Sequence, residues 1–285
     1  MTTIIEFTTM PRIWRFLPRL VWSLGKRASG ESALPNVEVR ARLPQDPVRI
    51  NQFANLVGHR EAGLPPTWPA GVVTPLLTAL VSHPQFPFPA IGLIHRQEEI
   101  SVLQPIKRTD ELRASLRLGE CRGASGGVCF DIHADIYRGT ERVWASRSEI
   151  LYRRGAALSA SRASESSVLD MDAHWQDVDI DLVRSYAAAS GNRDPIHVSP
   201  FLARALGLPG AIMHGLWTLG RASSLLTPCE PPYGLKIQFR RPLVVPGRAG
   251  WALGKDGESF TVVSPEGGKP FALGSRYALA RDEAR

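Results

Sequence analysis

Two segments of the chain repeat the hydrophobic spacing of a short helix. Residues 50–59 and 183–192 align, with an aromatic side chain at the same place, apolar positions three or four apart, and a glycine near the end. Glycine ends helices readily because it adopts the left-handed backbone conformation without strain. A strand-rich stretch follows each segment, opening at 91–94 in the first case and at 233–236 in the second. The pattern predicts a distant internal repeat, with a helix and then strands in each half.

The later part of each half alternates between apolar and polar positions, as antiparallel strands do. In residues 130–137 every second side chain, starting from Phe130, is apolar and falls on one face. Residues 142–152 are also strand-like, and a Lys-Asp-Gly turn at 255–257 leads into a further strand-like run at 258–263. Helices followed by runs of strands predict an α+β fold with antiparallel sheets.

Composition divides the chain into four regions. Residues 1–36 form a basic, aromatic N-terminal arm, 37–154 the first half of the body, and 168–285 the second half. Residues 155–167 between the halves are rich in Ala and Ser and lack an apolar period, which is typical of a linker. At 285 residues the chain is long enough for both halves to bury a hydrophobic core.

The arm contains a hydrophobic run with interspersed arginines at residues 13–22. This run predicts a short helix with cationic residues on one side. An interfacial membrane anchor is one interpretation. An arm that lies over the body of the protein is the other, and Pro18 favours it because proline would disturb a continuous helix.

The chain carries a formal net charge of +7, which favours polyanionic partners. Coenzyme A, an acidic carrier protein, a lipid surface and nucleic acid all fit that description. Nucleic-acid binding is disfavoured because the positive charge is dispersed, without surface aromatic residues between the cations. No stretch has the roughly 18 to 20 apolar residues needed to cross a bilayer, so we expect no transmembrane segment.

Cysteine and histidine are irregularly spaced along the chain. The three cysteines, Cys121, Cys129 and Cys229, are odd in number and lack the spacing of metal ligands. This argues against a disulfide scaffold and fits a reducing cytoplasm. The histidines show no metal-ligand spacing either, so we expect no metal site. From the cysteines we expect a cytoplasmic protein.

The most specific motif lies in the second half, at the end of its predicted helix. Residues 190–197 read Ser-Gly-Asn-Arg-Asp-Pro-Ile-His, and His214-Gly215 follows later. This pairing resembles the signature of the MaoC-like dehydratases, also called (R)-specific or type-2 enoyl-CoA hydratases. The loop in that family usually reads Ser-Gly-Asp-x-Asn-Pro-x-His, so Asn192 and Asp194 have exchanged places here.

The resemblance implies that each half is a hotdog, a curved antiparallel sheet wrapped around one central helix. Two such halves in one chain make a double hotdog. The first half has neither Asp-Pro-Ile-His nor His-Gly, so it would be a degenerate copy that shapes the acyl-chain tunnel. A long or bulky acyl chain is then the expected substrate. Hotdogs commonly pair through their sheets, which leaves a homodimer open.

Hydrating a 2-enoyl thioester requires a base for the water, an acid for the alpha carbon, and donors for the charge on the thioester oxygen. His197 titrates near neutral pH and can hold or pass the proton. Asp194 supplies a carboxylate, Asn192 can orient a water, and Pro195 stiffens the loop that carries them. We expect His197 and Asp194 to handle the water and the proton.

The oxyanion donor is expected at the start of a buried helix predicted for residues 213–226. The N–H groups of a first helical turn lack internal partners and carry the positive end of the helix dipole. Gly215 has no side chain to keep a thioester carbonyl away, and the resemblance assigns the donor role to the glycine after the His. For His214, a packing or hydrogen-bonding role and direct contact with substrate are both open.

Coenzyme A would enter only as part of the substrate, because this reaction needs no metal or redox cofactor. The phosphates of coenzyme A favour cationic partners. The candidates lie on a predicted strand and on the predicted buried helix: Lys236, Arg240, Arg241 and Arg221. An ordinary solvated position is the alternative for each of them.

The sequence thus favours an (R)-specific enoyl-CoA hydratase or (3R)-hydroxyacyl-thioester dehydratase, acting on an acyl-CoA or an acyl-carrier-protein thioester. Asn192 supports a second hypothesis, a non-catalytic hotdog subunit that binds acyl thioesters or supports an active partner. A hotdog thioesterase is a third hypothesis. Those enzymes commonly use an acidic residue on the central helix, and residues 213–226 contain none.

Overall fold

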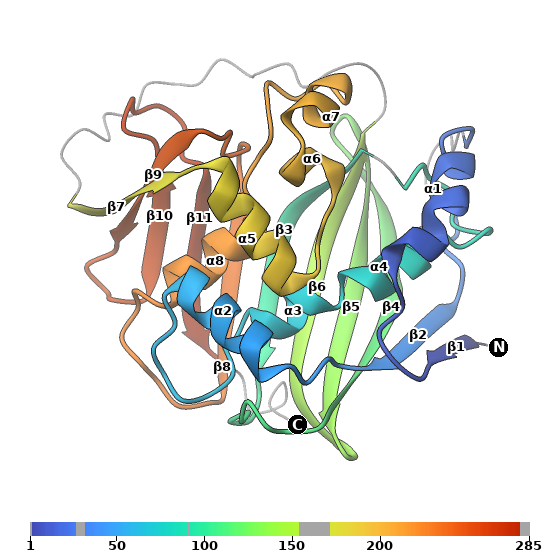
Figure 1. Ribbon diagram of the computed structural model, residues 1–285, viewed down its shortest axis with the longest axis horizontal. Helices are drawn as coiled ribbons and strands as arrows, with labels where there is room; N and C mark the ends of the chain where they lie inside the picture. The colour runs from blue at the N-terminus through green and yellow to red at the C-terminus, as the bar shows by residue number, and fades with distance from the viewer. Residues whose placement is uncertain (1, 27–31, 91, 154–171, 280–285) are drawn as a thin grey trace.

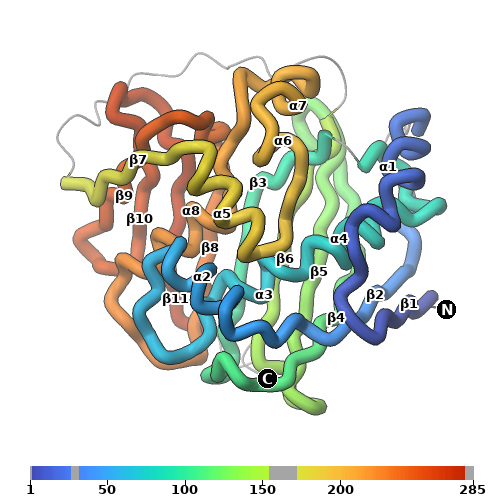
Figure 2. Tube along the Cα trace, viewed as in Figure 1, coloured from blue at the N-terminus to red at the C-terminus, as the bar shows by residue number. Residues whose placement is uncertain are grey.

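The computed structural model describes residues 2–26, 32–90, 92–153 and 172–279. The strands of these residues form one sheet in the order β1-β2-β4-β5-β6-β3-β8-β11-β10-β9-β7 (Figures 1 and 2). The strands are β1 (Thr3–Phe7), β2 (Val37–Arg42), β3 (Leu93–Val102), β4 (Leu112–Ala124), β5 (Gly127–Arg138), β6 (Glu141–Arg153), β7 (Ala173–Val178), β8 (Tyr233–Phe239), β9 (Gly247–Leu253), β10 (Ser259–Val263) and β11 (Ala272–Ala278). The helices are η1 (Ile13–Phe16), α1 (Leu17–Ser23), α2 (Pro47–Val57), α3 (Trp68–Val72), α4 (Thr74–Val81), α5 (Ile180–Ser190), α6 (Pro195–Val198), α7 (Pro200–Ala205) and α8 (Gly215–Ser223).

The two halves of the body join edge to edge through their sheets. Strand β3 of the first half pairs antiparallel with β8 of the second, and Ile100 lies opposite Leu235. Every other strand pair in the order given is also antiparallel, apart from the parallel pair β1 and β2. Helices α2, α3, α4, α5 and α8 lie over one face of this continuous sheet (Figure 1). The expected α+β class is confirmed, with the two expected sheets fused into one.

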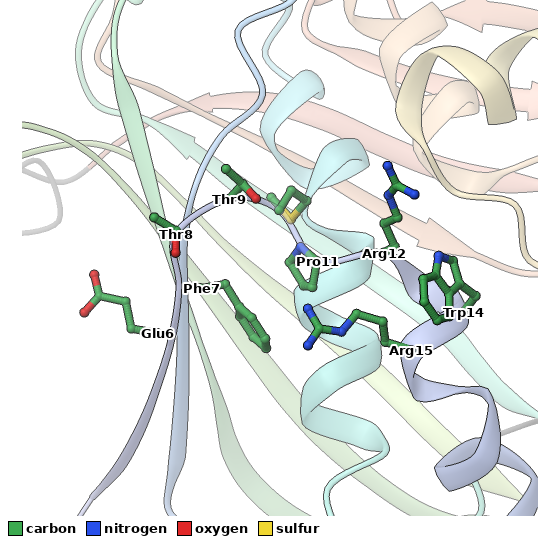
Figure 3. A pocket seen from close by; sticks show the side chains of 9 residues that line it. Glu6, Phe7, Thr8, Thr9, Pro11, Arg12, Trp14 and Arg15 are labelled. Carbon is green, nitrogen blue, oxygen red and sulfur yellow. The ribbon is translucent and has the colours of Figure 1, made fainter.

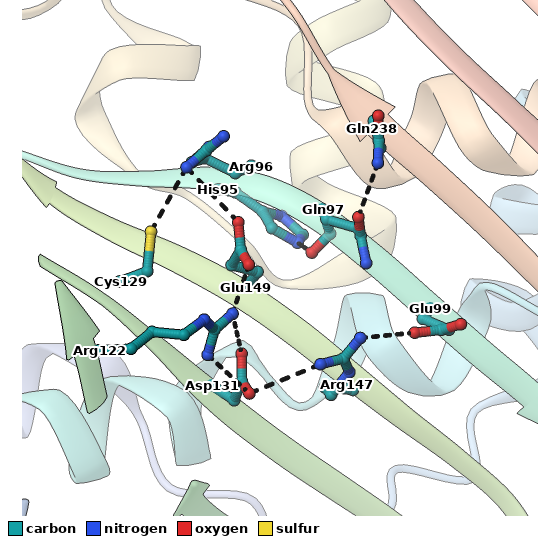
Figure 4. Close-up of polar contacts among 10 residues, drawn as sticks. All are labelled: His95, Arg96, Gln97, Glu99, Arg122, Cys129, Asp131, Arg147, Glu149 and Gln238. Atoms are coloured by element: carbon teal, nitrogen blue, oxygen red, sulfur yellow. Dashed lines mark hydrogen bonds and ion pairs between the residues drawn. The ribbon is translucent and has the colours of Figure 1, made fainter. Parts of the chain in front are cut away.

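The side chains of strand β5 alternate between an apolar face and a charged face of the sheet. Phe130 and Ile132 are buried in the core, as their alternation predicted. Asp131 between them faces the other side, where its carboxylate pairs with Arg122 and Arg147 (Figure 4). Because a buried carboxylate is costly unless it is paired, these arginines allow Asp131 to be only 5% exposed.

Helices α2 and α5 occupy corresponding places in the two halves. Asp46 caps the start of α2 and Asp179 the start of α5; the Asp46 carboxylate accepts two backbone N–H groups of the first turn and the Asp179 carboxylate accepts one. Gly58 and Gly191 follow the last helical residues with φ of 74° and 82°, in the left-handed region. Both predicted helices and both predicted glycine ends are confirmed.

The helices of the two halves pack on one another at the centre of the molecule. The aligned aromatics Phe53 and Tyr186 are in contact, with ring centroids 5.2 Å apart. Trp217 of α8 is fully buried and donates its indole N–H to the Leu56 carbonyl at 2.8 Å. The predicted buried helix is confirmed, although α8 is shorter than the expected 213–226. The first half therefore supports the helix that begins at Gly215.

The N-terminal arm lies against the first half of the body, as one of its two interpretations expected. Strand β1, which the sequence did not predict, adds to the sheet beside β2, with Thr3 opposite Val37. Helices η1 and α1 follow and cover the predicted run, and Phe16 between them is buried in the core. The expected linker, residues 155–167, lies outside the described residues, so the domain boundaries on either side of it stay predictions.

Candidate active site

The loop after α5 is held by its own polar side chains. Ser190 Oγ donates to the Tyr186 carbonyl at 2.8 Å and accepts the Asn192 N–H at 3.3 Å. Asn192 Oδ1 in turn accepts the Asp194 N–H at 3.3 Å. The Asp194 carboxylate accepts the Ile196 N–H at 3.2 Å and so caps helix α6. Local hydrogen bonds of this kind are typical of Asn, Asp and Ser in turns, and they set the direction in which the chain leaves α5.

His197 is fixed in one tautomer at the end of this loop. Its ring Nδ1 lies 2.8 Å from the Ile212 carbonyl, which can only accept a hydrogen bond, so Nδ1 carries the proton. The remaining nitrogen, Nε2, then has the free lone pair that a base requires. Burial lowers the pKa of His197, while the Asp194 charge and the bond to Ile212 act in the opposite direction. The imidazole is therefore neutral at neutral pH.

His214 lies against His197 at the start of α8. The two rings stack with centroids 3.7 Å apart. His214 is 3% exposed, and its Nε2 donates to the Asn192 carbonyl at 3.0 Å, which ties the loop to the helix. Burial, and next the neighbouring His197, hold its pKa well below the ordinary histidine value. The structure thus supports a packing and hydrogen-bonding role for His214, and its buried Nδ1 has no partner among the described residues.

Gly215 is the first residue of α8. No acceptor for its N–H lies among the residues that the structure describes. A Cβ atom at this position would lie 2.6 Å from Cζ of Phe239, well inside a normal contact. The absence of a side chain is thus first a packing requirement, because the Phe239 ring occupies that space. The positive end of the helix dipole still lies at Gly215, next to His214 and the His197 ring that stacks on it.

Asp194 lies apart from this cluster. Its side chain is exposed and engaged in capping α6, and no described hydrogen bond joins it to His197. Its negative charge still acts on His197 through space. The backbone carbonyl of Asn192 reaches His214, while the Asn192 amide stays within the loop. The structure brings His197, His214 and Gly215 together, and it leaves Asp194 at the edge of the group.

Arg241 differs from the other phosphate candidates. Its guanidinium lies over the Phe271 ring, 4.2 Å from the ring centroid. Two of its buried nitrogens, Nε and Nη2, have no hydrogen-bond partner among the described residues. The chain just beyond it runs beside the start of α8, since the Leu243 carbonyl accepts the Met213 N–H at 2.8 Å. Arg241 therefore offers unused donors, two residues before the segment that pairs with the residues leading into α8.

The remaining three cations have other surroundings. Arg221 donates to Gln176 and Ser224 near the end of α8, away from Gly215. Lys236 projects from the charged face of the sheet, 3.7 Å from Glu99. Arg240 is exposed and donates to Gln238 at 2.7 Å. None of these contacts brings a cation to the histidine pair.

Sequence reasoning did not identify Arg49 as part of the site. This residue of α2, in the first half, donates Nε and Nη2 to the Ala189 carbonyl at 3.2 and 3.0 Å. Ala189 lies just before Gly191, so Arg49 fixes the place where the loop begins. The pairing spans the two halves of the chain, and no local sequence signal marks it. Phe239 was also missed, because its role depends on contact with Gly215.

Two findings bear on metals and membranes. In residues 2–26, 32–90, 92–153 and 172–279 there is no group of three or more His, Cys, Asp or Glu side chains that could hold a metal ion. Over the same residues, no helix is long and apolar enough to span a bilayer.

Burial of neutral His214 predicts a loss of stability in acid. Its folded-state pKa is below the unfolded value of about 6.5, so the unfolded chain binds the proton first as the pH falls. The contribution of neutral His214 to the free energy of unfolding is therefore fully present above about pH 6.5. It decreases as the pH falls toward the folded-state pKa. We expect His214→Gln, which can keep a donor at the Nε2 position, to reduce the difference between the Tm at pH 7.5 and the Tm at pH 5.5. The exposed His174→Gln serves as control, and equal differences in both variants would contradict the assignment.

Comparisons with known proteins concern the region of this loop and the fold as a whole. The model of the MaoC like domain family matches residues 170–231, which contain the loop and the start of α8. The 3-hydroxyacyl-thioester dehydratase X of Mycobacterium tuberculosis is 28% identical over 226 residues, which are 76% of this chain and 80% of that protein. A crystal structure of HtdX from the same organism matches with a TM-score of 0.73 and 25% identity, over 85% of this chain and 100% of that one. A MaoC-like dehydratase from Phytophthora capsici has the same fold, with a TM-score of 0.64 at 16% identity, over 93% of this chain and 99% of that one. Residues 170–231 therefore match a MaoC-like domain, and the chain has the double-hotdog fold of these structural relatives.

Proposed function

We propose that the protein is a hydro-lyase that interconverts a 2-enoyl thioester and a (3R)-3-hydroxyacyl thioester. The observation that carries this proposal is His197, held as the Nδ1–H tautomer beside the start of helix α8. The similarity to a 3-hydroxyacyl-thioester dehydratase supports the reaction class. The thioester would be carried by coenzyme A or by an acyl carrier protein.

The free lone pair of His197 Nε2 supplies the base of the reaction. In the hydration direction it takes a proton from water as the water oxygen bonds to C3, and negative charge develops on the thioester oxygen. The imidazolium then returns that proton to C2, which discharges the enolate and restores neutral His197. The Gly215 N–H, at the positive end of α8, is the donor for the charge on the thioester oxygen. Both groups are positioned before substrate binds, which lowers the cost of reaching the transition state.

The remaining expectations fit the same proposal. No step requires a metal or a redox cofactor, and coenzyme A takes part only as the carrier of the acyl group. The unpaired donors of Arg241 make it the preferred phosphate contact of the four cations. The odd number and irregular spacing of Cys121, Cys129 and Cys229 support a reducing cytoplasm as the proposed location. A homodimer remains a proposal.

The exchanged residues Asn192 and Asp194 favour a second candidate, a subunit that binds acyl thioesters without turning them over. The exposed position of Asp194 is the observation behind it. A spectrophotometric assay of the purified protein separates the two candidates. Loss of the enoyl absorbance with crotonyl-CoA, or with longer 2-enoyl-CoA substrates, supports the hydro-lyase. Binding of these thioesters without loss of absorbance supports the non-catalytic subunit.

Asp194→Asn tests the role of the relocated carboxylate. Asparagine caps a helix as well as aspartate does, so α6 is preserved while the charge is removed. The charge opposes the lowering of the His197 pKa, so its loss should shift the acid limb of the pH–kcat profile to lower pH. Because a less basic imidazole is a weaker general base, we expect kcat at neutral pH to fall, and by less than the loss of about a hundredfold or more that is expected when the base itself is removed. Asn192→Asp is the matched variant, and its kcat is expected to stay near that of the wild type. An Asp194→Asn enzyme with unchanged turnover and pH profile would exclude a catalytic role for this carboxylate.

A further inference from the structure

The N-terminal arm presents an apolar stripe to solvent. Large hydrophobic side chains at a helical spacing are exposed along η1 and α1, and Trp14 and Trp22 are each 62% exposed. The stripe consists of Trp14, Leu17, Val21, Trp22 and Leu24. The hydrophobic side chains of a surface helix normally face the body of the protein. Here the most apolar side of the helix faces away from it.

The opposite side of the same helix attaches the arm to the body. Phe16 is buried in the core and contacts Phe7, with ring centroids 6.3 Å apart. Ser23 Oγ accepts the Ala90 N–H at 3.0 Å. Lys26 donates to the carbonyls of His83 and Pro84 at 3.2 Å each, just past the end of α4. These contacts attach the arm from the side opposite the stripe; within the stripe, the Trp22 ring lies 4.9 Å from the Lys26 ammonium.

Cationic side chains run beside the apolar stripe. Arg12, Arg15 and Arg19 are exposed at helical spacing, and none has an ion pair with any residue that the structure describes. The sequence from residue 7 to residue 30 contains no Asp or Glu. The local charge is therefore uniformly positive over the whole length of the helix.

A surface hollow of about 590 Å³ lies at the start of the helix (Figure 3). Arg12, Trp14 and Arg15 are among its lining residues. Glu6 also lines it, but its carboxylate is paired with Arg113 at 2.6 Å. The hollow thus combines two unpaired guanidinium groups with an exposed indole. This is a suitable place for a phosphate group next to an apolar phase.

We propose that the arm docks the protein on an anionic phospholipid surface. Indole rings prefer the boundary between headgroups and acyl chains, and arginines beside them bind the lipid phosphates. The stripe runs along η1 and α1 and ends at Leu24, just past α1, which suits a flat interface where one side of the arm can be immersed. This attachment is independent of the proposed reaction.

Co-sedimentation with vesicles tests the proposal. The wild-type protein should bind vesicles that contain phosphatidylglycerol in phosphatidylcholine, and bind pure phosphatidylcholine much more weakly. Each cation near an anionic surface contributes about a fivefold factor, so the Arg12→Gln, Arg15→Gln, Arg19→Gln triple variant should bind about a hundredfold more weakly. Trp14→Ala with Trp22→Ala should lower binding at least tenfold and leave turnover of a soluble enoyl-CoA unchanged.

Matched controls remove equal charge and equal apolar surface elsewhere. The triple variant Arg184→Gln, Arg248→Gln, Lys255→Gln removes three exposed cations from the second half, and Phe201→Ala removes a side chain that is 77% exposed on α7. Both should bind vesicles as the wild type does. The proposal is overturned if the wild type does not bind anionic vesicles, or if the control triple loses binding as the arm triple does. A concentration-dependent dimer that is lost with the two tryptophans, without vesicle binding, would instead make a second copy of the chain the partner.

Discussion

His197→Asn is expected to lower kcat for enoyl-thioester hydration by about a hundredfold to ten-thousandfold. The amide nitrogen of asparagine can take the place of Nδ1 and keep the bond to the Ile212 carbonyl, which is 2.8 Å long in the wild type. The lone pair at Nε2 is lost, and an amide cannot accept a proton near neutral pH. The variant therefore removes the base with little change to the loop.

The distribution of the effect between kcat and KM separates catalysis from structure. A base that acts on water contributes mainly in the transition state, so we expect kcat to fall and KM to change little. The Tm should stay close to that of the wild type. His174→Asn, at an exposed position of β7, is the control and should have wild-type kinetics. A His197→Asn enzyme with turnover near that of the wild type would exclude the imidazole as the base.

Gly215→Ala is expected to impair both activity and stability. The added methyl group would meet Cζ and Cε1 of Phe239 at 2.6 and 2.7 Å, so the ring or the start of α8 must move. Overpacking of this kind costs about 1 to 3 kcal/mol of unfolding free energy. A displacement of about 1 Å at the oxyanion donor lowers the rate about a hundredfold. Urea denaturation and the kcat of hydration measure the two effects.

A second substitution identifies the cause of the Gly215→Ala defect. Phe239→Ala in the same chain makes room for the methyl group, so the double variant should lose less stability than the two single variants added together. Gly25→Ala is the control, because a Cβ atom there would meet only the Trp22 carbonyl oxygen, at an ordinary 3.6 Å. If Gly215→Ala has wild-type stability and turnover, close packing at this position is not required.

The elements that the sequence predicted are those fixed by local chemistry. Helices α2 and α5 follow from apolar spacing and from glycines that adopt the left-handed conformation, and both ends are found where the pattern placed them. The strand alternation from Phe130 follows from the pleat of a strand, and its apolar face is buried. Asp194 as the cap of α6 was not predicted, although Asp followed by Pro is a common helix start.

The parts that were not predicted depend on contacts between distant residues. The pairing of β3 with β8 and the bonds from Arg49 to Ala189 connect the two halves of the chain. Lys236 could be assigned to a face of the sheet only after the register of β8 was known. The Phe239 ring over Gly215 likewise results from the fold as a whole. The histidine motif was visible in the sequence, whereas the residues that position it were not.

A crystal structure with a bound 3-hydroxyacyl thioester, such as 3-hydroxybutyryl-CoA, tests the central claim most directly. We predict that the thioester oxygen lies about 3 Å from the Gly215 nitrogen, and that the 3-hydroxyl oxygen lies within hydrogen-bonding distance of His197 Nε2. Both contacts should come from one ligand in one pose. A thioester bound elsewhere, with its carbonyl and hydroxyl oxygens out of reach of Gly215 and His197, would contradict the proposed site.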